Sequence, residues 1–178
     1  MSQAQKYSLP MRVMHWLIAA MILSLIAVGW YMEGLDRSVE AKFAVFYPLH
    51  KSFGALVLLL VLARVVIKVF SAKPVLPDYV EGLARKAAVA SHHLMYMLML
   101  AIPLSGYLMS NAGGRAVKMF GLELPTLVEK NKELGGLMHE IHVTIPYVLL
   151  ALIAVHIGAA IKHHWFDDSK RSFIKRMA

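Results

Sequence analysis

The 178-residue sequence contains no cysteine, and this absence limits the redox chemistry that the chain can support. It excludes disulfides, cysteine-ligated iron–sulfur clusters and haem attached covalently through a C-x-x-C-H motif. Charged residues are also scarce, at 17% of the chain, whereas 58% of the residues are hydrophobic. Any redox centre must therefore be held by histidine or oxygen ligands in a largely apolar environment.

Long stretches with little or no charge identify four segments that can cross a membrane. A helix needs about 20 mainly apolar residues to span the hydrocarbon core. The connections between these segments are rich in Gly, Pro or charged residues, which favour turns and loops. The sequence therefore predicts an all-α, four-helix transmembrane bundle that forms a single domain over residues 1–178. The four predicted spans are residues 13–32, 43–67, 87–110 and 141–161.

Basic residues are distributed unevenly, which predicts how the bundle is oriented. The amino terminus, residues 64–86 and the carboxyl-terminal tail from Lys162 hold twelve Lys or Arg and four Asp or Glu. The rest of the chain holds seven of each kind, so these three regions carry the entire net charge of +8. By the positive-inside rule, both termini are predicted to be cytoplasmic. Because topology explains the charge, we expect a lipid bilayer and no nucleic acid among the partners.

Nine histidines are present, and those inside the predicted spans are candidates for function, because ionisable groups are costly in a bilayer. Each could instead be solvated by lipid headgroups or bonded to a backbone carbonyl, so agreement among several histidines is needed. His142 and His156 are 14 residues apart, nearly four whole turns, so they share one helix face about 21 Å apart along the axis. His139 lies about 100° around the helix from His156 and outside the apolar stretch. The fourth span therefore favours His142 and His156.

The predicted topology places four histidines at two depths. His15 and His156 lie near the cytoplasmic ends of the first and fourth spans, and His50 and His142 lie near the outer ends of the second and fourth. Two imidazoles at each depth suit a haem, because the porphyrin supplies the other four iron ligands. A structural zinc ion would need four protein ligands. With both axial positions filled, the expected task is electron transfer; metal transport is an alternative, although it would require ligands at intermediate depths.

Four stretches of the sequence, taken in order, resemble the helices of the bacterial cytochrome b561 family. They are MRVMHWLI, PLHKSFGALVLLLVLARVVIK, AIPLSGYLMSNAGGRAVKMFGLELPTL and HEIHVTIPYVLLALIAVHIGAAIKHHWF. This family comprises small di-haem membrane cytochromes, superoxide oxidase among them, and the similarity covers nearly the whole chain. The resemblance implies residence in the bacterial inner membrane and two non-covalent b-type haems. The implied axial ligands of the haem iron are His15, His50, His142 and His156.

The resemblance also implies a site for ubiquinone, as a bound substrate, near the cytoplasmic end of the fourth helix. His163 and His164 match the family's residues there, although the same stretch resembles an ordinary interfacial helix end with an aromatic anchor. Arg64, at the cytoplasmic end of the second helix, is expected to contact the quinone or a haem propionate.

Three other cations have expected partners of their own. Lys51 beside His50 and Arg12 near His15 are expected to pair with haem propionates, because buried anions need partners. Lys68 is expected to extend to lipid phosphate at the cytoplasmic surface.

The third span contains no expected haem ligand. His92 and His93, at its cytoplasmic end, are expected to form hydrogen bonds at the membrane interface. Pro103 is expected to kink the helix, and Gly106 to allow a close approach to it.

Two functions are consistent with these features. The first is a superoxide:ubiquinone oxidoreductase, in which the family resemblance supplies superoxide as the donor at the outer face. An anion is drawn to a positive surface, yet the outer side has no net charge, so attraction would depend on a local patch. Candidate residues for that patch are Arg115, Lys118, Lys130 and Lys132. The second function is a membrane anchor that passes electrons between a soluble redox partner, docked on the connection of residues 111–138, and the quinone pool.

Overall fold

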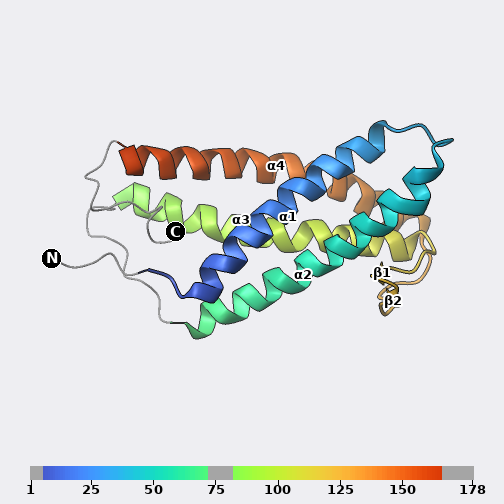
Figure 1. The fold of residues 1–178 in the computed structure, drawn as a ribbon, viewed down its shortest axis with the longest axis horizontal. Helices are drawn as coiled ribbons and strands as arrows, with labels where there is room; N and C mark the ends of the chain where they lie inside the picture. Colours follow the sequence, from blue (N-terminus) through green and yellow to red (C-terminus); the bar gives the residue numbers. More distant parts are fainter. Residues whose placement is uncertain (1–5, 72–81, 166–178) are drawn as a thin grey trace.

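The structure is a computed structural model that describes residues 6–71 and 82–165, except the side chains of Ala84 and His163. Within these residues it consists of four long helices, one π-helical turn and one two-stranded hairpin (Figure 1). The elements are α1 (Leu9–Gly34), η1 (Lys42–Phe46), α2 (Tyr47–Phe70), α3 (Gly82–Ala112), β1 (Lys118–Met119), β2 (Leu122–Glu123) and α4 (Lys132–Trp165). The four helices are long and apolar enough to cross a membrane, which confirms the predicted four-helix bundle. They extend beyond the predicted spans because a span counts only the residues in hydrocarbon.

Successive helices run in opposite directions between the two ends of the bundle (Figure 1). The α1–α2 connection and the hairpin lie at one end, which we call the hairpin end. The start of α1, the end of α2, the start of α3 and the end of α4 lie at the other, which we call the terminal end. The side of the membrane that each end faces stays a prediction from the distribution of charge.

Side-chain packing is concentrated halfway along the bundle. α1 packs along α2, α2 along α3 and α3 along α4. All four helices contribute to a buried apolar core, which we call the mid-bundle layer: Ile18, Ile22, Val57, Val61, Met95 and Leu149. Leu149 is seven residues from both His142 and His156, so this layer separates the two depths at which the histidines lie. Many other large apolar side chains are exposed, as expected for helices surrounded by lipid.

A buried lysine joins the two ends of the connection between α1 and α2 through a hydrogen bond. Lys42 is only 6% exposed, and its Nζ donates a hydrogen bond to the Leu35 carbonyl oxygen (2.7 Å) just after α1 ends. Carbonyl groups at a helix end lack partners within the helix, and the helix dipole favours a cation there. Pro10 and Pro48 lie in the first turns of α1 and α2, where the helix does not use the missing N–H.

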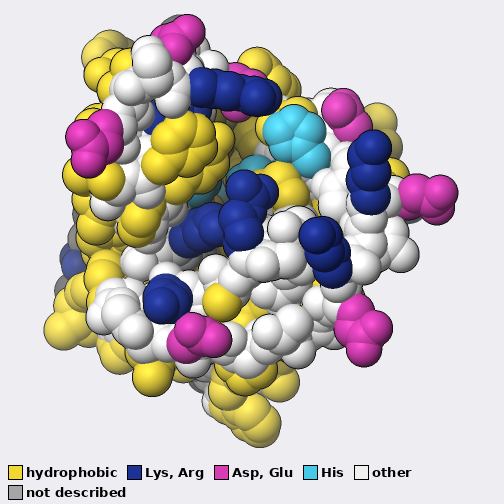
Figure 2. Space-filling model, turned by 90° about the vertical axis from the view of Figure 1, so that its right-hand side faces the viewer, with side chains coloured by type: hydrophobic (Ala, Val, Ile, Leu, Met, Phe, Trp, Pro, Cys, Tyr) yellow, Lys and Arg dark blue, Asp and Glu magenta, His cyan; other side chains and the backbone are white. Residues whose placement is uncertain are grey.

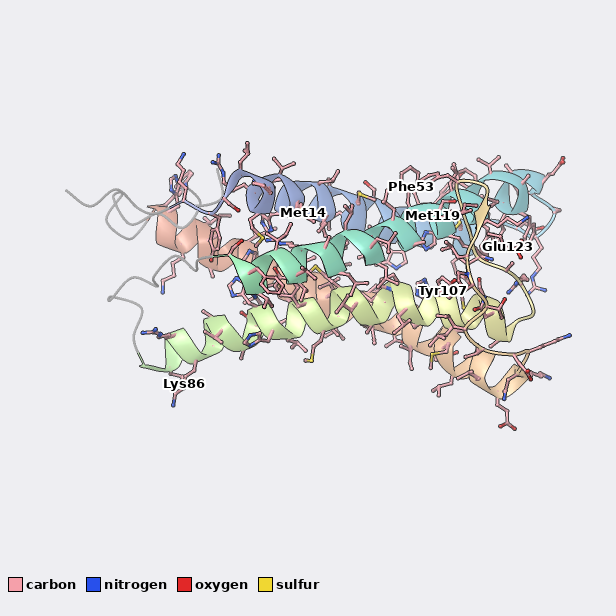
Figure 3. The ribbon with its side chains drawn as sticks, turned by 90° about the horizontal axis from the view of Figure 1, so that it is seen from below. Met14, Phe53, Lys86, Tyr107, Met119 and Glu123 are labelled. Atoms are coloured by element: carbon pink, nitrogen blue, oxygen red, sulfur yellow. The ribbon has the colours of Figure 1, made fainter. Side chains whose placement is uncertain are left out.

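The α3–α4 connection is folded onto the ends of α2 and α3 (Figure 3). Phe120 (φ 50°) and Gly121 (φ 92°) form the turn between β1 and β2, with the positive φ values typical of a type I′ turn. The Phe120 amide donates to Ser52 Oγ on α2 (3.1 Å), and Ser52 Oγ also lies 3.1 Å from the Lys118 carbonyl oxygen. On α3, Tyr107 Oη donates to a carbonyl oxygen of the connection (2.6 Å). These bonds fix the connection over the hairpin end.

Candidate functional site

Four histidines form two pairs inside the bundle, one toward each end. The ring centroids of His15 on α1 and His156 on α4 are 6.4 Å apart. The centroids of His50 on α2 and His142 on α4 are 6.1 Å apart. These are the pairs predicted from depth, and the structure brings each of them together. His139, which the helical spacing excludes, is exposed on α4.

The spacing within each pair suits two axial ligands of one iron atom. Two metal–imidazole bonds of about 2 Å, together with the radii of the two rings, separate the ring centroids by roughly 6 Å. The observed separations of 6.4 and 6.1 Å agree with this value. In addition, the backbones of α1 and α2 lie close to each other and that of α4 lies close to α3, so neither α1 nor α2 is in close backbone contact with α4. The donor set and its geometry therefore fit a haem at each depth.

The hairpin-end pair contains an imidazole that is held by α3. His142 Nδ1 lies 2.8 Å from the carbonyl oxygen of Ile102. A carbonyl can only accept, so Nδ1 carries the hydrogen and Nε2 of the neutral ring keeps its lone pair. Ser105 Oγ donates to the same carbonyl (2.8 Å) and lies 3.4 Å from His142 Nδ1. Metal-binding histidines typically donate a hydrogen bond from the nitrogen that does not bind the metal. This bond fixes the orientation of the ring and leaves the other nitrogen free to bind.

The partner of this imidazole lies in a less polar environment. His50 is half-buried, and its Nδ1 is buried without a hydrogen-bond partner among the described residues. Lys51, the next residue, is also half-buried and lies within electrostatic range of Arg115. A buried polar atom without a partner is rare in proteins. The hairpin end therefore has an unsatisfied imidazole next to two cations.

The terminal-end pair is held in a different way. Arg64 is only 6% exposed, and its Nη1 lies 3.0 Å from His15 Nδ1. A guanidinium can only donate, so this nitrogen of His15 accepts. The Nε atoms of Arg64 and Arg12 are both buried without partners among the described residues. Buried Arg64 and half-buried Arg12 near His15 therefore each have a buried Nε without a partner among the described residues, an arrangement suited to carboxylates such as haem propionates.

Two further side chains on α3 belong to the terminal-end site. The ring of His92 lies 5.4 Å from that of His156, and His92 Nδ1 donates to the Ala88 carbonyl oxygen (2.6 Å). Sequence reasoning assigned His92 only an interfacial hydrogen bond, and nothing in the sequence links it to a residue 64 positions away. The ring of Tyr96 lies beneath two cations, Arg64 and Lys68, and Lys68 Nζ is 4.2 Å from the ring centroid. Lys68 therefore packs against protein, in addition to the expected reach toward lipid.

The predicted quinone residues are only partly described. His164 is half-buried near the end of α4, whereas the side chain of His163 lies outside the described residues. The third predicted residue, Arg64, contacts His15. The quinone assignment therefore stays a prediction.

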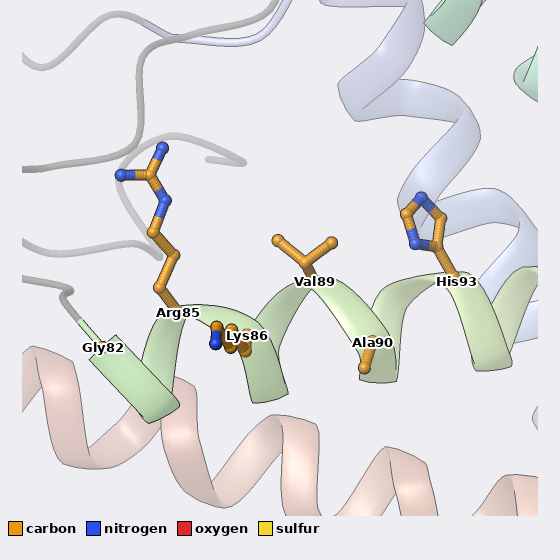
Figure 4. Close-up of a pocket in the computed structure, with 6 residues that line it drawn as sticks. All are labelled: Gly82, Arg85, Lys86, Val89, Ala90 and His93. Carbon is orange, nitrogen blue, oxygen red and sulfur yellow. The ribbon is translucent and has the colours of Figure 1, made fainter.

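A shallow hollow at the start of α3, of about 620 Å³, lies at the terminal end (Figure 4). Its lining residues are Gly82, Arg85, Lys86, Val89, Ala90 and His93. None of the four paired histidines lines it, so this hollow is separate from the imidazole pairs. Over residues 6–71 and 82–165, no three His, Asp or Glu side chains gather in a way that could hold a metal ion.

Membrane-spanning helices with paired imidazoles in their interior define a class of protein, the membrane cytochromes with b-type haem. The family profile described as "Prokaryotic cytochrome b561" matches residues 6–177, and the chain belongs to this family. It is therefore a membrane electron-transfer protein, and membership implies b-type haem.

Three relatives are similar over most of their length. "Cytochrome b561 homolog 2" of Escherichia coli (strain K12) is 31% identical over 175 residues, which cover 97% of this chain and 91% of the relative. "Cytochrome b561 homolog 1" of the same strain is 27% identical over 158 residues, covering 86% and 87%. "Probable superoxide oxidase CybB" of Yersinia pestis is 25% identical over 166 residues, covering 90% of each chain.

Proposed function

We propose that this protein is a di-haem cytochrome of the bacterial inner membrane that passes electrons from superoxide at its hairpin end to ubiquinone at its terminal end. The observation that carries the proposal is the stacking of two imidazole pairs, each with the spacing of axial ligands, along one bundle. His50 and His142 would hold one b-type haem, and His15 and His156 the other. Each haem, when bound, supplies a one-electron carrier.

The terminal-end cations support a cofactor with carboxylates. Arg12 and Arg64 each have a buried Nε without a partner among the described residues, so we assign them to propionates of the terminal-end haem. Lys51, half-buried beside His50, is assigned to a propionate of the hairpin-end haem. Ubiquinone would bind beyond the terminal-end pair, with His163 and His164 as the proposed contacts. In this orientation the basic terminal end faces the cytoplasm, as the positive-inside rule requires.

The charge at the hairpin end supports an anionic donor. Figure 2 shows Lys and Arg side chains gathered in a hollow at this end, with histidine beside them. Lys51 and Arg115 lie close enough to interact electrostatically, whereas Lys118 is partly neutralised by an exposed ion pair with Glu123 (3.7 Å). A concave basic surface concentrates small anions, even where the wider surface has no net charge. The name of the Yersinia pestis relative supports superoxide as that anion.

The overall reaction balances in electrons and protons. Each superoxide anion loses one electron and leaves as dioxygen, without giving up a proton. One ubiquinone takes two such electrons and two protons and becomes ubiquinol. The residues of this chain attract the anion at the hairpin end, hold the propionates and orient the imidazoles. The electrons also cross the membrane field, which is worth about 2.3 kcal/mol per charge for each 100 mV.

A haem assay and a superoxide pulse test the proposal. The purified protein is expected to contain two haems per chain by pyridine haemochrome assay and to show low-spin bands in a reduced-minus-oxidised spectrum. A pulse of superoxide, with no other protein present, is expected to reduce it and, with ubiquinone added, to form ubiquinol. A colourless protein, or one haem per chain, would overturn the di-haem assignment. Failure of superoxide to reduce a two-haem protein would overturn the donor assignment.

One observation favours the membrane-anchor function as an alternative. The α3–α4 connection is fixed on the bundle, yet it exposes Phe120, Leu122 and Leu127, which could contact a soluble partner. Under this alternative, the haems are reduced only when a partner protein is added to the purified chain. The superoxide pulse therefore distinguishes the two functions.

A further inference from the structure

α3 carries no predicted haem ligand, yet three of its residues lie next to the His142 imidazole. The Ile102 carbonyl oxygen accepts from His142 Nδ1 (2.8 Å). Ser105, 3% exposed, places its Oγ 3.4 Å from the same nitrogen. One residue further along, the backbone of Gly106 lies directly against the ring.

The contact at Gly106 leaves no room for a side chain. A Cβ atom at this position would lie 2.7 Å from Cε1, 2.9 Å from Nδ1 and 3.3 Å from Nε2 of His142. Separations below 3.0 Å essentially do not occur for Cβ atoms, so even alanine would displace the ring. The backbone at Gly106 is helical, so glycine is needed here for space and not for conformation. The hydrogen bond therefore restricts movement of the imidazole within the plane of its ring, and the Gly106 backbone restricts movement perpendicular to that plane.

We propose that the Ile102 carbonyl and Gly106 form an orienting cradle on α3 that sets the position of His142 as a haem ligand. This inference rests on the proposed function, because it assumes that His142 binds the hairpin-end haem. The cradle residues are positioning residues: they act through His142 and do not touch the iron. The hydrogen bond selects the nitrogen that faces the iron, and Gly106 selects the orientation of the ring.

Three glycines of the helices provide a graded comparison. The Cβ clash at Gly106 is the closest, whereas a Cβ at Gly29 on α1 would lie 3.5 Å from Cε1 of His50, an ordinary contact. A Cβ at the exposed Gly158 on α4 would meet nothing within 4 Å. Each glycine-to-alanine change adds the same methyl group and raises helix propensity equally. Any difference among the three variants therefore reports the space beside the ring.

The test compares Gly106→Ala with Gly29→Ala and Gly158→Ala in the full-length protein. Haem content and the low-spin electron paramagnetic resonance signals are measured for each variant. Gly106→Ala is expected to keep one haem of two and to lose the signal that His142→Ala loses, or to keep both haems with that signal shifted. Gly158→Ala is expected to match the unmodified protein, and Gly29→Ala to keep both haems. Two haems with unchanged signals in Gly106→Ala would overturn the cradle.

A double variant covers the case in which Gly106→Ala fails to fold. In His142→Ala the ring is absent, so the added methyl group at position 106 has no clash partner. Gly106→Ala in that background is expected to leave the remaining haem unchanged, a coupling that a double-mutant cycle measures. Loss of the remaining haem in the double variant would overturn the proposal. If instead the unmodified protein lacks haem, the proposed function fails, which is a distinguishable outcome.

Discussion

The two imidazole pairs have nearly the same ring separation but opposite hydrogen bonding at their Nδ1 atoms. At the hairpin end, His142 donates from Nδ1 to a backbone carbonyl, so Nε2 is ready to bind a metal. At the terminal end, His15 accepts at Nδ1 from Arg64, so the hydrogen of the neutral ring sits on Nε2. If His15 held a haem iron through Nε2, the hydrogen would have to lie on Nδ1, and Arg64 would have to donate to another acceptor, for which a propionate is suited. The His142 ring is held by a backbone carbonyl, whereas the hydrogen bonding of the His15 ring is set by a cationic side chain.

The largest expected effect is the loss of one haem at a time. His142→Ala should remove the hairpin-end haem and His15→Ala the terminal-end haem, because each variant lacks one axial ligand. Haem content should fall from two to one per chain in both variants, and difference spectra should show that different bands are lost. His139→Ala is the matched control and should keep both haems. If His139→Ala loses a haem and His142→Ala does not, the assignment on α4 is wrong.

The next effect should fall on the terminal-end haem alone. Arg64→Gln removes a buried cation, and loss of a positive charge near an iron centre disfavours its reduced state. At about 8 Å and an effective dielectric constant near 20, this interaction is worth about 2 kcal/mol. Potentiometric titration should show a lower midpoint potential for the terminal-end haem and little change at the hairpin end.

Two variants control for the charge and contact of Arg64. Arg64→Lys keeps the charge and should shift the potential less than Arg64→Gln. Lys68→Gln removes a cation one turn away that packs on Tyr96, and its effect should also be smaller. Equal shifts in Arg64→Gln and Lys68→Gln would show that contact with His15 has no special effect.

A smaller effect is expected on the rate of reaction with superoxide. Arg115→Gln removes a cation near Lys51 at the hairpin end and should slow reduction by superoxide roughly threefold at low ionic strength, because a basic surface concentrates anions. The effect should shrink as salt is added. Arg85→Gln, a change of the same kind at the terminal end, should leave the rate unchanged. Stopped-flow spectroscopy over a range of salt concentrations measures both, and equal slowing would rule out steering by the hairpin end.

The smallest expected effect concerns the hydrogen bond of His142. Ser105→Ala removes a competing donor from the Ile102 carbonyl, so the bond from His142 should strengthen slightly. A stronger bond favours oxidised iron, and we expect a lower hairpin-end midpoint potential, by about 0.5 kcal/mol. Potentiometric titration against the unmodified protein checks the sign. A rise in this potential would show that Ser105 supports the His142 bond instead of competing with it.

The sequence predicts depth along the bundle better than it predicts neighbours around it. Runs of apolar residues located the four helices, and the 14-residue spacing of His142 and His156 gave their depths. The order of helices then sufficed to match each with His15 or His50. The ligand roles themselves stay predictions.

Contacts between helices were harder to predict, because they depend on how each helix is rotated about its axis. Gly106 was expected to allow a close approach, but its partner His142 is 36 residues away, and no local pattern links them. The bond of Arg64 to His15 and the contact of His92 with His156 were missed for the same reason. The burial of Lys42 was also unforeseen, because its acceptor is a backbone carbonyl, which every residue carries.

The mid-bundle layer has a consequence for energy conversion. Its six side chains, from Ile18 to Leu149, hold no atom that could relay a proton or stabilise a passing ion. Under the proposed function, a charge that crosses this layer would travel as an electron alone, and the protons of ubiquinol would be taken up separately where the quinone is reduced. Turnover under the proposed function would therefore be electrogenic, with the mid-bundle layer as the insulating barrier across which the voltage forms.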